Sequence, residues 1–227
     1  MSDIDALIAA ARDNFRWCWY VASRESRRVV PAGTQAFVQS LFVGTNLTGA
    51  RVIEPVWMRL ESYDGRRVHG ELLFPPDEIT GLHPGMKFSN QAEAISDWVL
   101  SCGEEVYGGW LLRLLYASAG DDTRGRLESI WGLAFDEPAK IPGLKPDFAE
   151  SLAEKLEEVS VERLREAELE IGDVTMNMLH WECLCGCAET ARHLVSRGLD
   201  PTERDSEGWS AFDYISVLGW EHIDLDA

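Results

Sequence analysis

The sequence has no hydrophobic run that could cross a membrane as a helix. Such a helix needs roughly 20 apolar residues, and the best candidate, residues 110–116, is interrupted by Arg113. Residues 1–11 contain Asp3 and Asp5 and no basic stretch, so they do not predict a secretory signal. We therefore expect no membrane partner and a cytoplasmic location.

The number and placement of the cysteines do not predict a disulfide framework. The chain has five cysteines, an odd number, and three of them lie within residues 183–187, which fits a reducing compartment. His180, Cys183 and Cys187 are spaced to share one helical face, and imidazole and thiolate suit zinc. The C-x2-C knuckle typical of structural zinc sites is missing, however. We predict that these residues are packing positions and that the protein has no metal and no cofactor.

The sequence also lacks the motifs by which many catalytic sites are recognised. It contains no G-x-S-x-G, no P-loop and no H-E-x-x-H. Asp97 and Trp98 are expected to be structural, the carboxylate accepting backbone hydrogen bonds at a strand end and the indole filling the core. We therefore predict that the protein is not an enzyme. An enzyme built on the first domain around Asp97, Trp98 and Tyr107 is the alternative.

Positive charge is in short supply, and negative charge is concentrated at one end. There are 21 Lys and Arg residues against 39 Asp and Glu, a formal net charge of −18. Residues 1–120 hold 11 basic and 14 acidic residues, a net of −3, whereas residues 121–227 hold 10 and 25, a net of −15. An acidic surface repels phosphate, which disfavours nucleic acid and anionic membranes and favours a basic protein partner. Solubility alone would also account for the charge.

The first half of the chain has the pattern of a helix followed by strands. Apolar residues recur every three or four positions over residues 4–22, which predicts an amphipathic helix. Asp64-Gly65 is a strong hairpin signal between two strand-like segments. The strands are expected at residues 36–43, 51–61, 66–74, 94–101 and 106–116.

Four motifs within this half keep a characteristic order. They are Gly-Glu-Leu-Leu at 70–73, Ile-Thr-Gly-Leu-His-Pro-Gly at 79–85, Ile-Ser-Asp-Trp at 95–98 and Tyr-Gly-Gly-Trp-Leu-Leu-Arg at 107–113. The series resembles the YegJ-like family of bacterial domains of unknown function, over about residues 4–117. The resemblance implies an α+β domain with a leading helix and a curled antiparallel sheet, and it implies no established activity.

The end of the chain resembles an ankyrin repeat. Residues 177–180, Asn-Met-Leu-His, stand where that family has Thr-Pro-Leu-His, and residues 197–201, Arg-Gly-Leu-Asp-Pro, resemble its closing turn. A second repeat opens at residues 205–212. Since one repeat cannot bury its own apolar face, we expect an all-α, ankyrin-like helical stack after the α+β domain. The expected boundaries are 1–120 for the α+β domain, 121–146 for a linker with a short helix, and 147–227 for acidic helices and repeats.

These resemblances and the charge together predict a binding protein. A small bacterial protein that pairs an uncharacterised α+β domain with ankyrin-like repeats looks like the immunity proteins that neutralise toxins of interbacterial competition, including those of type VI secretion nucleases. A nuclease needs a basic cleft, which an acidic inhibitor complements. An ankyrin-type adaptor or regulator of another cytoplasmic protein is the other alternative. The side chains expected to contact the partner are Glu157, Glu158, Glu162, Glu203, Asp205, Glu207, Trp209 and Trp220.

Overall fold

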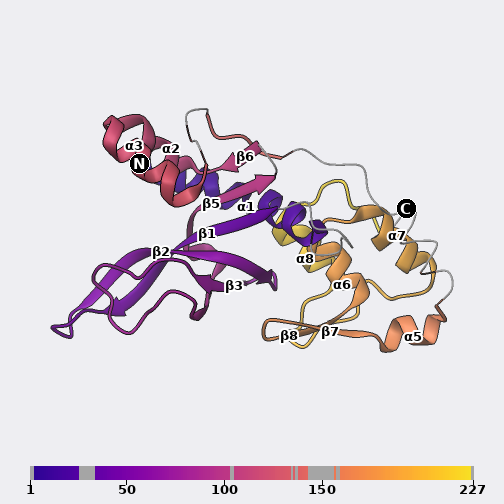
Figure 1. The fold of residues 1–227 in the computed structure, drawn as a ribbon. Coiled ribbons are helices and arrows are strands. Elements are labelled where there is room, and N and C mark those ends of the chain that lie inside the picture. The colour runs from indigo at the N-terminus through magenta and orange to yellow at the C-terminus, as the bar shows by residue number, and fades with distance from the viewer. Residues whose placement is uncertain are drawn as a thin grey trace. The chain divides into compact units, whose positions relative to one another are not determined.

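A computed structural model describes residues 3–25, 34–102, 105–133, 135, 138–142, 156 and 159–225 (Figure 1). The chain divides into two compact units. The first comprises Met1–Glu61 and Arg67–Gly143, and the second comprises Ser62–Arg66 and Leu144–Ala227. A short segment from the first half of the sequence, Ser62–Arg66, therefore belongs to the second unit.

The first unit is a six-stranded sheet with helices before and after it. The strands lie in the order β4-β3-β2-β1-β5-β6, and the pairs β1–β2, β1–β5, β3–β4 and β5–β6 are antiparallel. The elements are α1 (Asp3–Glu25), β1 (Gln35–Thr45), β2 (Arg51–Tyr63), β3 (Arg67–Leu72), β4 (Lys87–Gln91), the 3-10 turn η1 (Ala92–Ala94), β5 (Ile95–Cys102), β6 (Glu105–Gly108), α2 (Trp110–Ser118) and α3 (Asp121–Trp131). The expected helix, sheet and Asp-Gly hairpin are confirmed.

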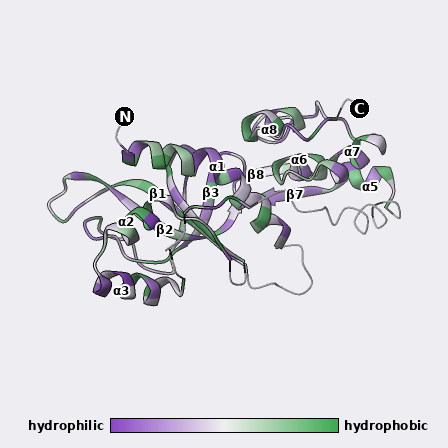
Figure 2. Cartoon of the chain, turned by 90° about the horizontal axis from the view of Figure 1, so that it is seen from above, coloured by the Kyte–Doolittle hydropathy of each residue, from purple (hydrophilic) through white to green (hydrophobic). Residues whose placement is uncertain are grey.

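Helix α1 packs on β5 through one apolar face. Ala11, Phe15 and Cys18 recur at helical spacing and are at most 4% exposed, which is why this segment forms an amphipathic helix. Trp98 of β5 is fully buried, and its indole Nε1 donates to the carbonyl oxygen of Ala11 at 2.8 Å. Figure 2 shows both hydrophobic and hydrophilic residues along α1, as a helix with one covered face requires.

The opposite face of the sheet carries a second apolar cluster. Side chains alternate between the faces of a strand, so Phe37 and Val99 point away from their neighbours Val38 and Trp98. The cluster consists of Phe37, Trp57, Val99, Leu112 and Phe135, with Trp131 of α3 packed against it. The rings of Trp57 and Trp131 meet edge to face with centroids 4.7 Å apart, a favoured aromatic geometry.

The strand expected at residues 106–116 is wrong beyond Gly108, because α2 begins at Trp110. Gly108 and Gly109 both have φ of +73°, a left-handed conformation that ends the strand and is favourable for glycine. A buried apolar run does not by itself distinguish a strand from a helix. The start of the helix is stabilised by a residue of β5, because the Asp97 carboxylate accepts hydrogen bonds from the first backbone N–H groups of α2.

The second unit is not the all-α stack expected from the sequence. It contains a two-stranded antiparallel hairpin, β7 (Glu168–Ile171) and β8 (Val174–Asn177), in addition to helices. The exposed Glu168 and Glu170 alternate with less exposed Leu169 and Ile171, a period of two that is typical of strands. The described helices are α5 (Val161–Glu166), α6 (Met178–Leu184), α7 (Ala188–Ser196) and α8 (Ala211–Leu218). Most of the acidic helix expected from residue 147 lies outside the described residues.

Candidate partner-binding surface

The loop between α7 and α8 is fastened to the start of α6. Asn177 and His180 form a capping box at the α6 N-terminus, each side chain bonding the other residue's backbone. On its other side the imidazole Nε2 of His180 contacts the backbone oxygen of Glu203 at 2.9 Å. His180 is 2% exposed. It therefore braces the loop, in keeping with the packing role expected from the sequence.

Asp205 organises the tip of this loop, which we call the finger (residues 203–209). Its Oδ1 accepts hydrogen bonds from the backbone N–H groups of Glu207 and Trp209, both at 2.8 Å. Its Oδ2 accepts from the hydroxyl of Tyr214 at 2.5 Å. Burial of Tyr214, together with this bond to a carboxylate, raises the pKa of its phenol. Asp205 thus shapes the finger through both carboxylate oxygens.

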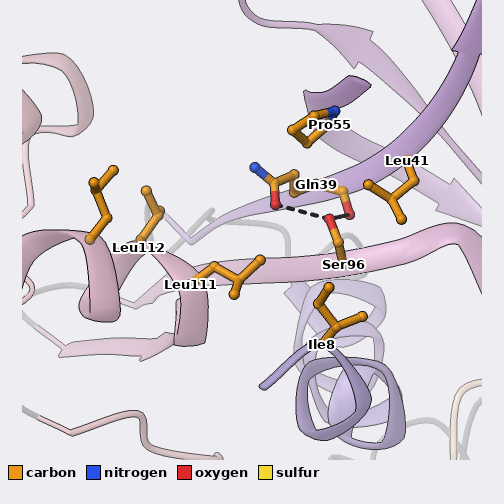
Figure 3. Close-up of a pocket in the computed structure, with 8 residues that line it drawn as sticks. Ile8, Gln39, Leu41, Pro55, Ser96, Leu111 and Leu112 are labelled. Carbon is orange, nitrogen blue, oxygen red and sulfur yellow. Dashed lines mark hydrogen bonds between the residues drawn. The ribbon is translucent and has the colours of Figure 1, made fainter. Parts of the chain in front are cut away.

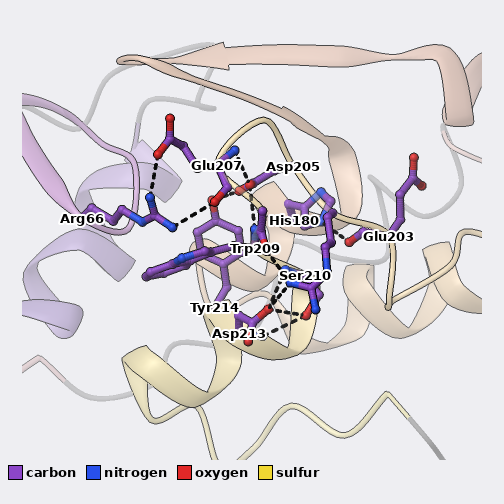
Figure 4. A network of polar contacts seen from close by, with 11 residues as sticks. Arg66, His180, Glu203, Asp205, Glu207, Trp209, Ser210, Asp213 and Tyr214 are labelled. Carbon is purple, nitrogen blue, oxygen red and sulfur yellow. Dashed lines mark hydrogen bonds and ion pairs between the residues drawn. The ribbon is translucent and has the colours of Figure 1, made fainter.

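Arg66 completes the finger from a distant part of the sequence. Its guanidinium lies over the ring of Trp209, 4.4 Å from the centroid, and pairs with the Glu207 carboxylate at 2.6 Å. A second guanidinium nitrogen donates to the Glu207 backbone oxygen at 3.2 Å. Gly65 fits against Tyr214, where a Cβ would stand 2.7 Å from the ring. Figure 4 shows Arg66, Trp209, Glu207 and Tyr214 gathered in this network.

The acidic residues predicted to contact a partner are not equivalent in the structure. Glu203 and Glu207 are exposed, although Glu203 accepts from the Asn177 amide at 3.2 Å and Glu207 is paired with Arg66. Asp205 is only partly exposed and is occupied by internal hydrogen bonds. The finger therefore presents less free negative charge than its sequence suggests.

The remaining predicted contact residues are scattered. Trp220 is 1% exposed, so it is a core side chain, and the expectation that it is a surface anchor is wrong. Trp209 is partly exposed and packs edge to face with Tyr214, at 5.2 Å between centroids. Glu162 is exposed on α5. Glu157 and Glu158 lie outside the described residues. The structure thus brings together Glu203, Asp205, Glu207 and Trp209, and adds Arg66.

The cysteine cluster is built for packing. Cys183, Cys185 and Cys187 are at most 2% exposed, and burial raises the pKa of the Cys183 thiol, which makes the thiolate form that binds metal unfavourable. In the described part of the chain, no group of three or more His, Cys, Asp or Glu side chains is arranged to hold a metal ion. None of the described helices has both the length and the hydropathy of a membrane span.

Asp97, the carboxylate of the alternative enzyme hypothesis, has a structural role in the first unit. Asp97 is fully buried and accepts from the backbone N–H groups of Trp98, Trp110, Leu111 and Leu112 at 2.8–3.3 Å. Burial raises its pKa to about 6, against the lowering effect of those hydrogen bonds. Asp97 and Trp98 therefore have the structural roles expected from the sequence. The hydroxyl of Tyr107, the other residue of the enzyme alternative, is bonded to Glu105.

The architecture defines an α+β sheet protein with a small, acidic second unit made of a hairpin and helices. Residues 2–135 match a family described as uncharacterized proteins conserved in bacteria (DUF2314). The chain belongs to this family, and the expectation of a bacterial family of unknown function is confirmed.

A comparison with curated proteins extends the likeness beyond the family domain. A protein of Neisseria meningitidis serogroup B, provisionally named an ankyrin repeat protein, is 25% identical over 225 residues. The match covers 94% of this chain and 88% of the relative, so it includes the second unit. No solved structure matches the chain.

Proposed function

We propose that the protein is a non-enzymatic, cytoplasmic immunity protein that binds and neutralises a basic toxin domain, such as a nuclease of type VI secretion. The main support for this proposal is the net charge of −15 in residues 121–227, combined with a finger that is ordered by its own hydrogen bonds. A pre-organised surface loses little conformational freedom on binding. The name of the Neisseria relative supports a role in protein interaction, because ankyrin repeats present loops to other proteins.

The proposed roles of the individual finger residues follow from how exposed their side chains are. Exposed carboxylates at the rim of an interface accelerate association, and salt weakens this effect. A partly exposed aromatic side chain that becomes fully covered slows dissociation. Glu203 is therefore proposed to attract the toxin, with a smaller contribution from Glu207, whose charge is offset by Arg66. Trp209, held between Arg66 and Tyr214, provides the apolar contact.

The test uses the product of the neighbouring gene, co-expressed and co-purified with this protein. If a complex forms, association rates are measured at low and high salt for Glu203→Gln/Glu207→Gln and for a matched control, Glu166→Gln/Glu189→Gln, which removes two exposed carboxylates of the same unit outside the finger. We expect the finger variant to associate several-fold more slowly at low salt and to show a weaker salt dependence. Equal rates for the two variants would contradict the proposed surface, and the lack of any complex would contradict the proposed partner.

A further inference from the structure

A small pocket opens in the first unit where α1, α2 and the sheet meet. Its volume is about 200 Å³. Leucine side chains of α2 and β1, Ile8 of α1 and the ring of Pro55 form its apolar wall, while Gln39 and Ser96 form a polar side (Figure 3). Among the described residues, none that lines it is charged. Such a lining suits an uncharged, largely aliphatic group.

Two irregularities in the sheet lie beside this pocket. The pairing of β1 with β5 shifts register between Gln39 and Ser40, and such bulges redirect side chains. Pro55 of β2 stands opposite Leu41 of β1 and has no backbone N–H to donate. The amide side chain of Asn90 donates to the Leu41 carbonyl at 2.9 Å. The sheet is therefore locally fixed by side chains in an irregular form beside the pocket.

The polar side of the pocket offers a hydrogen-bond donor. The hydroxyl of Ser96, a residue that is 1% exposed, donates to Oε1 of Gln39 at 2.9 Å. This bond orients the amide so that its nitrogen points away from Ser96 (Figure 3). No acceptor for that nitrogen is found in the part of the chain that the structure describes. The pocket thus combines an aliphatic wall with an unused N–H donor.

Exposed apolar side chains lie close to the lining residues of the pocket on four elements, β1, β2, α1 and α2. Val43 and Ile53 form the next same-face pair beyond Leu41 and Pro55, and they are 41% and 67% exposed. Leu115 of α2 lines the pocket and is 48% exposed. Ile4, one helical turn before Ile8 on α1, is 52% exposed. Exposed apolar side chains that gather next to a pocket are typical of an interaction site.

We propose that this pocket receives one aliphatic side chain of a partner polypeptide, whose backbone carbonyl accepts a hydrogen bond from the Gln39 amide. An apolar cavity of roughly 150 Å³ holds a benzene molecule, so the observed volume suits a side chain of leucine size. A free small molecule of that size would leave Val43 and Ile53 uncovered, whereas a polypeptide covers them. The uncharged lining disfavours a carboxylate ligand. The site goes beyond the proposed acidic contact surface and does not depend on a toxin.

The experiment uses N-acetyl-leucine N-methylamide as the probe, with the corresponding aspartate derivative as the charged comparison. Methyl NMR spectra of the full chain are recorded during titration. We expect saturable shifts of the Ile8 and Leu111 methyl signals with the leucine probe, with a dissociation constant in roughly the millimolar range. The aspartate probe should cause no such shifts.

A matched pair of variants tests the location. Leu115→Trp places a bulky group at the pocket mouth, while Leu114→Trp alters the neighbouring residue, which is similarly exposed at 43% and does not line the pocket. We expect only Leu115→Trp to abolish the shifts. Gln39→Glu keeps the acceptor for Ser96 and removes the donor, so it should weaken binding about two- to tenfold.

Several outcomes would overturn the proposal. They are equal shifts with both probes, equal behaviour of the two tryptophan variants, and unchanged affinity of Gln39→Glu. A dimer in sedimentation that Ile53→Lys dissociates would assign the patch to a second copy of the chain and also overturn it. Neither the probe nor these variants involve the finger, so the result is independent of the proposed immunity function.

Discussion

The contact between Arg66 and the finger leads to a quantitative prediction. Arg66→Gln removes a cation–π contact of about 0.5–1 kcal/mol, a partly exposed ion pair of about 0.2–1 kcal/mol, and a hydrogen bond to the Glu207 carbonyl of about 0.5–1.5 kcal/mol. The guanidinium stands 4.4 Å from the Trp209 centroid and 2.6 Å from the Glu207 carboxylate. Because these terms share one side chain and are not additive, we expect a total loss of about 1–2 kcal/mol.

Hydrogen exchange of the finger amides is the appropriate assay. The Glu207 and Trp209 amides are bonded to Asp205, so they exchange when the finger opens locally. A loss of 1–2 kcal/mol makes their exchange about 5- to 30-fold faster. Arg66→Lys should fall between wild type and Arg66→Gln, because lysine keeps the charge but lacks the planar group that stacks.

The control is Arg163→Gln, which removes an exposed arginine of α5 in the same unit and should change exchange of the finger less than twofold. Finger exchange in Arg66→Gln that matches the control would refute the reasoning. It would show that the contacts of Arg66 contribute nothing measurable to the order of the finger.

Three further predictions concern the stability of the fold. The pKa of Asp97 is raised to about 6, so the folded state binds a proton more readily than the unfolded state. Protonation of Asp97 therefore stabilises the fold below pH 4, and this stabilisation, at most about 3 kcal/mol, is lost as the pH rises through 6. Urea unfolding of Asp97→Asn at several pH values should lack this component, and an identical pH profile would contradict it. Gly108→Ala places a Cβ 2.3 Å from the Trp98 carbonyl oxygen, whereas a Cβ at Gly132, also at positive φ, has nothing within 4 Å. Urea unfolding should show a loss of stability of about 1–2 kcal/mol for Gly132→Ala and a clearly larger loss for Gly108→Ala. Equal losses would count against the close approach at Gly108. Trp220→Ala should lower the unfolding free energy by about 3–5 kcal/mol, measured in the same way, and a change under 1 kcal/mol would show that Trp220 is not a core residue.

Local patterns in the sequence predicted much of the first unit. The three- and four-residue spacing of apolar side chains predicted α1, and Asp64-Gly65 predicted the β2–β3 hairpin, where Gly65 has φ of +96°. The start of α2 was missed, because it depends on the Asp97 carboxylate, 13 residues before Trp110. The alternation of polar and apolar residues over 168–171 is typical of a strand and indicates the β7–β8 hairpin. The expectation of an all-α stack, which rests on the ankyrin resemblance, left this pattern out of account.

The candidate surface was only partly predictable for a different reason. The acidic and aromatic residues of the finger lie together in the sequence, so their proximity needed no structure. Arg66 is 141 residues away from Glu207, and no periodicity or motif connects them. The burial of Trp220 likewise depends on tertiary packing, since an isolated tryptophan near the end of a repeat gives no indication of which side is covered.

The central claim, that the finger mediates neutralisation of a basic toxin, is tested most directly by cell survival. Cells that express the product of the neighbouring gene are plated with wild-type protein, with Glu203→Lys, or with the control Glu189→Lys, after unchanged melting temperatures have been established for both variants. The account predicts that wild type and Glu189→Lys restore colony formation and that Glu203→Lys restores it at least tenfold less. Equal protection by all three proteins would contradict the role of the finger, and no protection by wild type would contradict the immunity function itself.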